Sequence, residues 1–301
     1  MSRNNKLLLR KYSVASTVQF ECQRVKTDLH RTLCHIFISQ KLKYLRNGKT
    51  EKTIMQLPYF YEPLLQPGQE SYTLSENTSK HCAQVLRMQS GSRLLLTDGK
   101  GLLAQATLAV PHKSRSLVKI THTEQKNYPV KKSCIAISLL KNTTRMDWFL
   151  EKATELGISE IIPMITDHTE KKHFRQDRAT AVLAAAMIQS RQTFLPVLQE
   201  PTPYLKVIEQ SAYRQKMIAH CEDRAKTDLS YIPLENDVQL LIGPEGDFSS
   251  EEITHAEKRG LIPVSLGTNR LRTETAGIAG AVLLTLQKHH IQQKNHEKKT
   301  T

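Results

Sequence analysis

Two stretches of this chain decide its fold: residues 241–249, LIGPEGDFS, and residues 264–276, VSLGTNRLRTETA. Each begins as a short apolar run, which is typical of a buried strand, and continues into a polar loop that contains glycine. The second stretch leads into an apolar pattern of helical period that continues to Gln287. Both stretches therefore predict a strand, a functional loop and a helix in succession.

The two loops carry the residue types of a ligand site. Gly243 and Gly246 predict a tight turn in which the backbone approaches a ligand closely. Arg270, Arg272 and Glu274 lie between a strand end and a helix start, where the helix dipole and free N–H groups favour anions. Neither loop is a G-x-G-x-x-G fingerprint or a Walker loop, which disfavours a Rossmann NAD enzyme and a nucleotide triphosphatase.

The sequence around these stretches alternates strand and helix patterns from Cys134 onward. Helix-start boxes occur at Thr144 with Asp147 and at Ser249 with Glu252. Strands are predicted at residues 134–140, 158–165, 216–220, 238–242 and 262–266, and helices at residues 144–157, 179–189, 249–260 and 273–287. Such alternation implies a parallel α/β sheet whose ligands lie at the carboxyl ends of the strands.

The preceding segment is rich in strand patterns and ends near Tyr128. Residues 93–98 and 102–110 flank an Asp-Gly turn, a strong signal of a β-hairpin. Residues 116–123 predict a third strand, and residues 75–87 a short helix with His81, Cys82, Val85 and Leu86 on one face. A small barrel-like module fits this pattern.

Composition excludes several classes of protein. The chain has 301 residues, of which 39% are hydrophobic and 24% charged, so it is neither wholly disordered nor collagen-like. No apolar run reaches the roughly 18 residues that a membrane span requires. Five scattered cysteines without a C-x-x-C pair predict a reducing, cytoplasmic setting rather than a disulfide framework, and no metal site is expected.

Basic residues are concentrated in the first 54 residues. This segment holds twelve Lys and Arg against three acids, a net +9 out of +14 for the chain. Because no helical or alternating period persists there, we expect a poorly ordered arm, or an extension that precedes a functional start at Met55. A basic transit peptide is an open alternative. The excess of positive charge favours polyanions such as nucleic acid.

The two loops together resemble one family closely. Residues 242–252, IGPEGDFSSEE, and residues 264–282, VSLGTNRLRTETAGIAGAV, resemble the RsmE-type 16S ribosomal RNA (uracil-N3) methyltransferases of the SPOUT class. The resemblance extends to residues 148–157, WFLEKATELG, to residues 218–222, IAHCE, and to residues 81–87, HCAQVLR. It covers about Met55 to Lys288.

The resemblance implies an α/β fold: a SPOUT trefoil-knotted methyltransferase domain after a small β-barrel PUA-like domain. The implied domains are a basic extension at 1–54, the PUA-like RNA-binding domain at 55–128, the methyltransferase domain at 129–290 and a basic tail at 291–301. It also implies S-adenosylmethionine as the cofactor, a homodimer, and methylation of uridine N3 in 16S ribosomal RNA of the small ribosomal subunit.

Site residues follow from the same resemblance. Arg272 is expected to be catalytic together with Glu274, whereas Arg87 and Arg270 are expected to contact RNA. The proton acceptor is left open between Glu274, Asp247 and solvent. Gln189 and Ser190 are expected to line the same pocket. The cofactor is expected to contact His220, Gly243, Glu245, Gly246, Ser265, Leu266, Gly267, Leu271, Thr273 and Ala276.

Two alternatives stay open at this point. A knotted methyltransferase could act on another RNA nucleotide or on a ribose hydroxyl. A non-catalytic RNA-binding protein of ribosome assembly could retain the fold, but this alternative predicts damaged cofactor loops, and Gly243, Gly246, Gly267 and Arg272 are all present.

The basic segment yields a testable prediction. A chain that begins at Met55 should fold and bind cofactor as well as the full chain, because residues 1–54 lack the apolar face that ordering requires. If the arm contacts RNA, its removal should weaken RNA binding at low salt and change little at high salt, since counterion release drives such contacts. Filter binding at two salt concentrations measures this. Loss of folding or cofactor binding would contradict the prediction.

Overall fold

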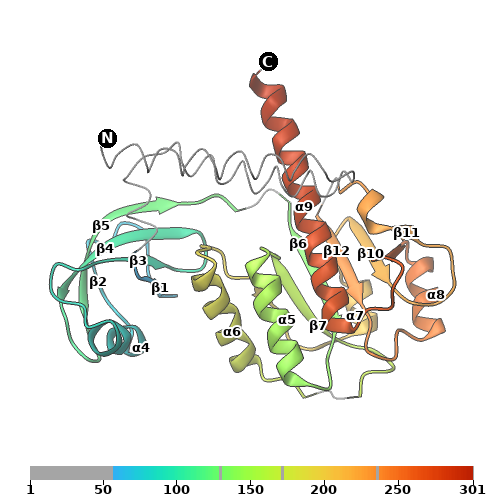
Figure 1. The fold of residues 1–301 in the computed structure, drawn as a ribbon, viewed down its shortest axis with the longest axis horizontal. Helices are drawn as coiled ribbons and strands as arrows, with labels where there is room; N and C mark the ends of the chain where they lie inside the picture. Colours follow the sequence, from blue (N-terminus) through green and yellow to red (C-terminus); the bar gives the residue numbers. More distant parts are fainter. Residues whose placement is uncertain (1–56, 129–130, 171–172, 235–236, 301) are drawn as a thin grey trace, which may run out of the picture. The chain divides into compact units, whose positions relative to one another are not determined.

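The computed structural model describes residues 57–128, 131–170, 173–234 and 237–300, with side chains through Gln287 (Figure 1). The segment 1–54, with its predicted lack of order, lies outside these residues. The described chain from Pro58 onward forms one compact unit. No helix among the described residues is both long and apolar enough to span a membrane.

A five-stranded sheet opens this unit, with the strand order β1-β3-β4-β5-β2. The hairpin, the third strand and the short helix start predicted from sequence are all present. The elements are β1 (Tyr59–Tyr61), β2 (Ser71–Thr73), α4 (Glu76–Lys80), the π-helix η1 (His81–Val85), β3 (Arg93–Thr97), β4 (Leu102–Val110) and β5 (Leu117–Gln125). Alternate residues of β4 point into the module's own apolar core, which includes Leu94, Leu108 and Val118.

The turn between β3 and β4 explains why this hairpin forms. The Asp98 carboxylate accepts hydrogen bonds from the backbone N–H groups of Lys100 (2.7 Å) and Leu102 (3.0 Å). Gly99 and Gly101 have φ angles of 73° and 103°, which a residue with a Cβ adopts only under strain. The same turn pairs with the segment after helix α6 (Gln176–Gln189), since Gly101 N–H donates to Thr193 O (2.9 Å).

The helical segment after β2 differs from its prediction. Ser75 caps α4 as expected, but the helix widens into η1, so the 3.6-residue period is lost. Cys82 is buried, whereas Val85 is 67% exposed and Leu86 is 43% exposed, so the predicted apolar face is wrong. The segment ends at Arg87, whose φ is 50°.

The rest of the chain builds an eight-stranded sheet whose principal order is β11-β13-β10-β12-β6-β7-β8, with β9 beside β7. Every strand pair in this sheet is parallel, which confirms the prediction from alternation. Its strands are β6 (Ser133–Ser138), β7 (Glu160–Ile165), β8 (Val197–Leu198), β9 (Thr202–Pro203), β10 (Gln215–Ala219), β11 (Thr227–Asp228), β12 (Val238–Ile242) and β13 (Ile262–Ser265).

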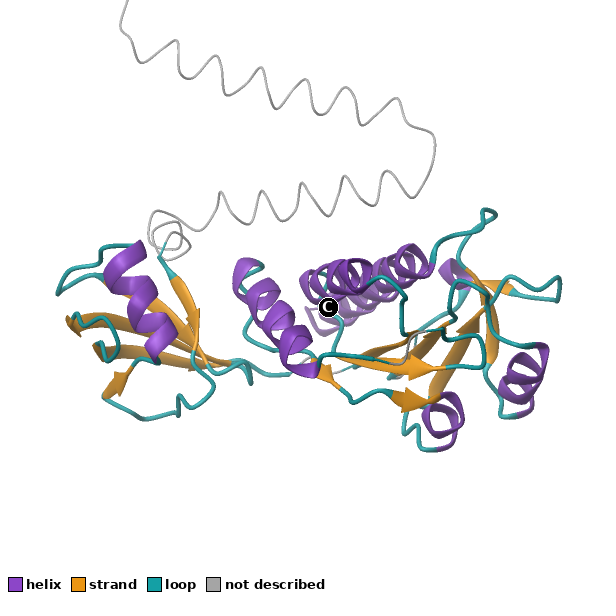
Figure 2. Cartoon of the chain, turned by 90° about the horizontal axis from the view of Figure 1, so that it is seen from below, coloured by secondary structure: helices purple, strands orange, loops and turns teal. Residues whose placement is uncertain are grey.

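Helices cover both faces of this sheet (Figure 2). Alternate strand residues such as Ile135 and Ala136 point to opposite faces, and each face has its own apolar cluster. One cluster joins the sheet to α5 (Thr143–Glu155), α6 (Gln176–Gln189) and α9 (Thr273–Thr300), and the other to α7 (Tyr204–Glu209) and α8 (Ser250–Lys258). The short 3-10 helix η2 (Leu229–Tyr231) follows β11.

Two helix boundaries differ from the sequence prediction. α5 is capped by Asn142, whose side-chain oxygen accepts from Thr144 N–H at 2.9 Å, so the helix does not start at the predicted Thr144 box. Asparagine is as good a cap as threonine, and the sequence offered both. α9 continues beyond its predicted end at Gln287 to Thr300, through residues that had been assigned to a tail.

Small residues let α9 lie close to its neighbours. A Cβ added at Gly277 would stand 2.6 Å from the Phe149 ring of α5, and one added at Gly280 would stand 2.4 Å from Leu240 of β12. These glycines therefore serve the packing of α9 against α5 and the sheet, which fixes the position of the loop that precedes α9. The predicted knot stays a prediction.

Candidate functional site

Three loops meet at the carboxyl edge of the large sheet. The strands β13, β10 and β12 are neighbours and parallel, and they end at Ser265, Ala219 and Ile242. Parallel strands bring their carboxyl ends to one edge, so the loops that follow lie together. The two stretches that decided the fold form two of these loops, and the segment after Ala219 forms the third.

The loop after β12 is shaped by packing beneath it. Gly243 is buried, and a Cβ added there would stand 3.0 Å from the ring of Phe248, which is itself buried. The loop turns where Asp247 N–H donates to Pro244 O (3.0 Å), and Asp247 has a φ of 66°. Gly243 is thus required by close contact inside the loop rather than by an unusual backbone angle.

Asp247 ties this loop to the one after β10. One carboxylate oxygen accepts from Cys221 N–H (2.6 Å) and the other accepts from Phe248 N–H (2.9 Å). Because both oxygens accept backbone hydrogen bonds, Asp247 acts as a structural tie between the two loops.

A fourth loop, after β7, supports the site and was missed by sequence reasoning. His168 Nδ1 lies 2.9 Å from Asp247 O, and the Asp167 carboxylate accepts from Ser249 Oγ (2.7 Å). Ser249 and Glu252 form the predicted capping box of α8, and Glu252 also accepts from Asp167 N–H (3.1 Å). Burial raises the pKa of the Glu252 carboxyl. Only these long-range pairings identify the loop, and no local motif marks it.

His220 follows β10 and is 7% exposed. Among the described residues neither of its ring nitrogens has a hydrogen-bond partner. Burial, and then the Lys226 ammonium, lower the pKa of the imidazole, which favours the neutral ring. A buried neutral ring with two free nitrogens is able to donate one hydrogen bond and accept another from a ligand.

Two cavities lie between the loops and share Arg270, Leu271 and Ala276 in their walls. One, of about 310 Å³, is lined by the loop after β12, and the other, of about 370 Å³, by the loops after β10 and β13. Nine of the ten residues expected to contact the cofactor line one or both: His220, Gly243, Glu245, Ser265, Leu266, Gly267, Leu271, Thr273 and Ala276. Gly246 does not, and its Cα faces His168 instead.

Comparison with known proteins identifies the family. Residues 126–285 match the model of an RNA methyltransferase domain, and residues 74–121 match that of an RNA methyltransferase PUA domain. The chain belongs to the RNA methyltransferase family. A curated relative, ribosomal RNA small subunit methyltransferase E of Synechocystis sp., is 27% identical across 91% of this chain and 93% of its own length. That alignment covers more of the chain than residues 55–301 contain, so part of the basic segment has a counterpart.

Solved structures of RNA methyltransferases resemble this chain in fold. A probable rRNA-methyltransferase from Porphyromonas gingivalis is 35% identical, covering 78% of this chain and 100% of its own, with a TM-score of 0.73. Ribosomal RNA small subunit methyltransferase E from Neisseria gonorrhoeae, solved with S-adenosyl methionine, is 27% identical, covering 76% and 97%, with a TM-score of 0.69. The predicted α/β architecture with a PUA-like module is thereby confirmed.

Arg270 and Arg272 both lie in the wall of the 310 Å³ cavity. Both are exposed, and within the described chain neither side chain forms a hydrogen bond or ion pair. Glu274, in the first turn of α9, is 6% exposed; its Oε1 lies 3.6 Å from Arg145 Nε. Its Oε2 has no hydrogen-bond partner among the described residues. Arg87, by contrast, belongs to the first module.

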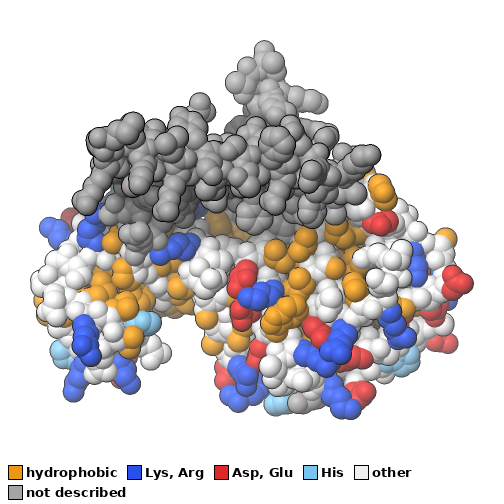
Figure 3. Space-filling model, viewed as in Figure 1, with side chains coloured by type: hydrophobic (Ala, Val, Ile, Leu, Met, Phe, Trp, Pro, Cys, Tyr) orange, Lys and Arg blue, Asp and Glu red, His pale blue; other side chains and the backbone are white. Residues whose placement is uncertain are grey.

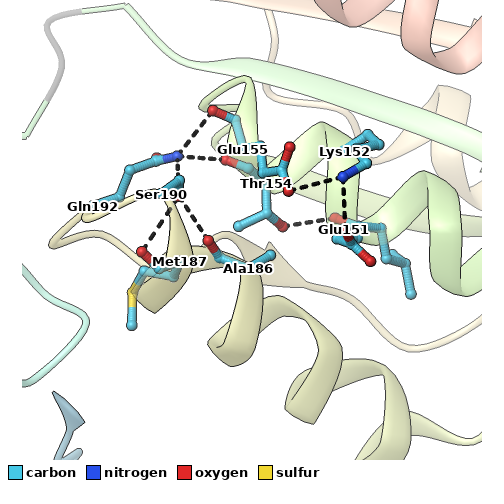
Figure 4. A network of polar contacts seen from close by, with 9 residues as sticks. Glu151, Lys152, Thr154, Glu155, Ala186, Met187, Ser190 and Gln192 are labelled. Atoms are coloured by element: carbon cyan, nitrogen blue, oxygen red, sulfur yellow. Dashed lines mark hydrogen bonds and ion pairs between the residues drawn. The ribbon is translucent and has the colours of Figure 1, made fainter. Parts of the chain in front are cut away.

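Ser190 does not reach these cavities (Figure 4). Its hydroxyl donates to Ala186 O (2.7 Å), and Gln192 Nε2 donates to Ser190 Oγ and to Thr154 O. This network joins the carboxyl ends of α5 and α6. Lys152 likewise pairs with Glu151 (2.7 Å) and Glu155 along the surface of α5. Neither Gln189 nor Ser190 lines these two cavities, in contrast to the prediction.

The residues present fit an adenosyl cofactor. The two cavities combine glycine backbone, the apolar side chains of Leu266 and Leu271, and the unpartnered nitrogens of His220. Such a mixture of apolar walls with a few polar groups is typical of a small-molecule site. Among the described residues no three His, Cys, Asp or Glu side chains gather as a metal site would require.

The packing around Gly243 yields a testable prediction. Gly243→Val should abolish binding of S-adenosylmethionine, because the new side chain collides with Phe248 and displaces the loop. Overpacking of this kind costs about 1–3 kcal/mol. Isothermal calorimetry measures the affinity, and thermal unfolding checks that the variant is folded. Ala181→Val serves as the control, since Ala181 is exposed on α6 and lines neither cavity. Unchanged affinity in Gly243→Val would contradict this account.

Proposed function

We propose that this chain transfers a methyl group from S-adenosylmethionine to N3 of a uridine in 16S ribosomal RNA of the small ribosomal subunit. One observation carries the proposal: the loops after β10, β12 and β13 enclose two cavities that share Arg270 in their walls. The names of the relatives support the substrate, since the Synechocystis and Neisseria proteins are both ribosomal RNA small subunit methyltransferases E.

The cofactor would be held mainly by backbone. Gly243 and Gly246 keep side chains away from the loop after β12, and Gly267, with a φ of 124°, does so after β13. The loop at Gly267 is held by Ser265, whose Oγ donates to Gly267 O (3.1 Å). Leu271 and Ala276 provide apolar contacts. When bound, S-adenosylmethionine supplies a methyl group on a sulfonium, an activated leaving group that requires no metal.

Arg272 would stabilise the charge that develops on the substrate. Uracil N3 carries a proton at neutral pH, and removal of this proton leaves negative charge on N3, O2 and O4 until N3 bonds to the methyl carbon and the carbon–sulfur bond of the donor breaks. The Arg272 guanidinium has no other partner in the described chain and lies in the wall of one cofactor cavity. A preorganised cation at this position lowers the barrier as an oxyanion hole does. Arg270, beside it, would contact a phosphate.

Glu274 would accept the proton from N3. Its carboxylate is buried, and Oε2 has no hydrogen-bond partner among the described residues, so it can accept a hydrogen bond from the substrate. Arg145 at 3.6 Å keeps Glu274 Oε1 oriented. The remaining carboxylate candidate, Asp247, is committed to the backbone of Cys221 and Phe248. Geometry therefore favours Glu274 as the general base.

The first module would bind the surrounding RNA. Arg87 is exposed and follows a π-helical turn, a feature that recurs at functional sites. Together with the +9 charge of residues 1–54, it would contact phosphates and recognise structured RNA by shape. The substrate is therefore an assembled particle in the cytoplasm rather than a short oligonucleotide. Mass spectrometry of 16S ribosomal RNA with and without the gene tests the proposal directly.

The role of Arg272 yields a testable prediction. Arg272→Ala should lower the rate of methyl transfer by about 10²–10³, the usual cost of losing one preorganised donor, and leave cofactor affinity nearly unchanged. Incorporation of labelled methyl groups into 30S particles measures the rate. Arg259→Ala is the matched control, because Arg259 is exposed, pairs with Glu209 and lines neither cavity. A normal rate in Arg272→Ala would show that another group stabilises the anion.

A homodimer is also part of the proposal. Ala279, Val282, Leu283 and Leu286 of α9 are half-buried in the single chain and leave apolar surface for a second copy. A two-fold pair through α9 would cover this surface. Light scattering at micromolar protein concentration should give the mass of two chains. A monomer under these conditions would rule the pairing out.

A further inference from the structure

We propose that Trp148 is the surface on which the target pyrimidine stacks, in a third cavity beside the cofactor loops. This inference rests on the proposed function and assigns the nucleobase to a particular part of the site. The cavity measures about 700 Å³ and is formed by the start of α5, the loop 270–272 and the first turn of α9.

The third cavity adjoins the site for the methyl donor. Arg270, Leu271 and Arg272 line both this cavity and the 310 Å³ cavity of the loop after β12. A base in the third cavity would thus lie next to the cofactor, with residues 270–272 in contact with both. Because the acceptor must reach the methyl carbon directly, the substrate has to occupy a space that adjoins the donor's, and this cavity does.

The start of α5 presents a polar and aromatic face to the cavity. Trp148 lies four residues after Thr144 and three after Arg145, so it shares one side of the helix with both side chains. Phe149 and Leu150 on the other side are fully buried. The core packing of α5 therefore fixes the direction of Trp148, which is 41% exposed.

An exposed indole beside guanidinium groups is suited to a nucleotide. Figure 3 shows hydrophobic side chains gathered over α5 and α9 with charged side chains next to them. Arg145, Arg270 and Arg272 line the cavity against one carboxylate, Glu274, so its charge favours an anionic ligand. Nucleobases stack on aromatic rings, and guanidinium groups bind phosphates and carbonyl oxygens. A second copy of this chain, which is itself basic, would not complement the positive charge of this cavity.

The chain contains one tryptophan, which makes the proposal directly measurable. Fluorescence of the full-length protein reports on Trp148 alone when excitation lies beyond the absorption of uridine and tyrosine. Titration with uridine 5′-monophosphate should quench this signal, whereas ribose 5-phosphate, which has the phosphate but no base, should not. Equal quenching by both compounds, or none by either, would overturn the proposal.

Variants separate stacking from a structural role. Trp148→Ala should raise the KM for 30S particles, within the roughly 5- to 150-fold range that loss of one stacked base produces. Cofactor affinity should not change. Trp148→Phe, which keeps an aromatic face, should have a KM close to that of the wild type. Tyr231→Ala is the control, since Tyr231 is 82% exposed and lines none of the three cavities.

The outcomes distinguish this inference from the function beneath it. Normal methylation by the wild type together with an unaffected Trp148→Ala variant overturns the stacking role alone. A wild type that methylates no uridine in 16S ribosomal RNA overturns the proposed function and the inference with it. Fluorescence that changes with protein concentration but not with nucleotide would assign this face to a second copy and refute the stacking role.

Discussion

The carboxylate of Asp247 accepts the backbone N–H of Cys221, and this hydrogen bond of 2.6 Å ties the loop after β12 to the loop after β10. Because β10 and β12 are parallel neighbours, the loops that follow them lie at one edge of the sheet. The pairing of the strands does not by itself fix the distance between the two loops. The left-handed backbone at Asp247, with φ of 66°, orients the side chain for this contact. The contact helps to shape both cavities, because Cys221 lies in the walls of both and Asp247 in the wall of the 310 Å³ cavity.

Much of the fold could be predicted because its signals are local. The Asp-Gly turn before Leu102, the Ser249–Glu252 capping box and the alternation of strands and helices all depend on residues within a few positions of each other. Nine of the ten residues expected to contact the cofactor line the two cavities, and they come from loop motifs whose parts are contiguous. Where the sequence offered two equivalent caps, as at Asn142 and Thr144, the prediction selected the wrong one.

The remainder depends on contacts between distant segments. The tie between Cys221 and Asp247, the support of Asp247 by His168 and the pairing of Arg145 with Glu274 join positions 26, 79 and 129 residues apart. No periodicity records such pairings. The same reason explains the difference from prediction at Ser190, whose neighbours are set by the end of α5, and the failure to single out Trp148, which a helical pattern assigns simply to the surface of α5.

The loop 270–272 contributes to the walls of all three cavities, and this sharing has a thermodynamic consequence. A ligand that binds one side of the loop and orders it would lose conformational entropy. A second ligand on the other side would then bind a loop that is already ordered, without losing that entropy again. Cofactor and RNA then favour each other's binding by an equal factor, as linkage requires. The loop that contacts both donor and acceptor would thereby also couple their affinities, and the enzyme with both ligands bound would be the preferred state.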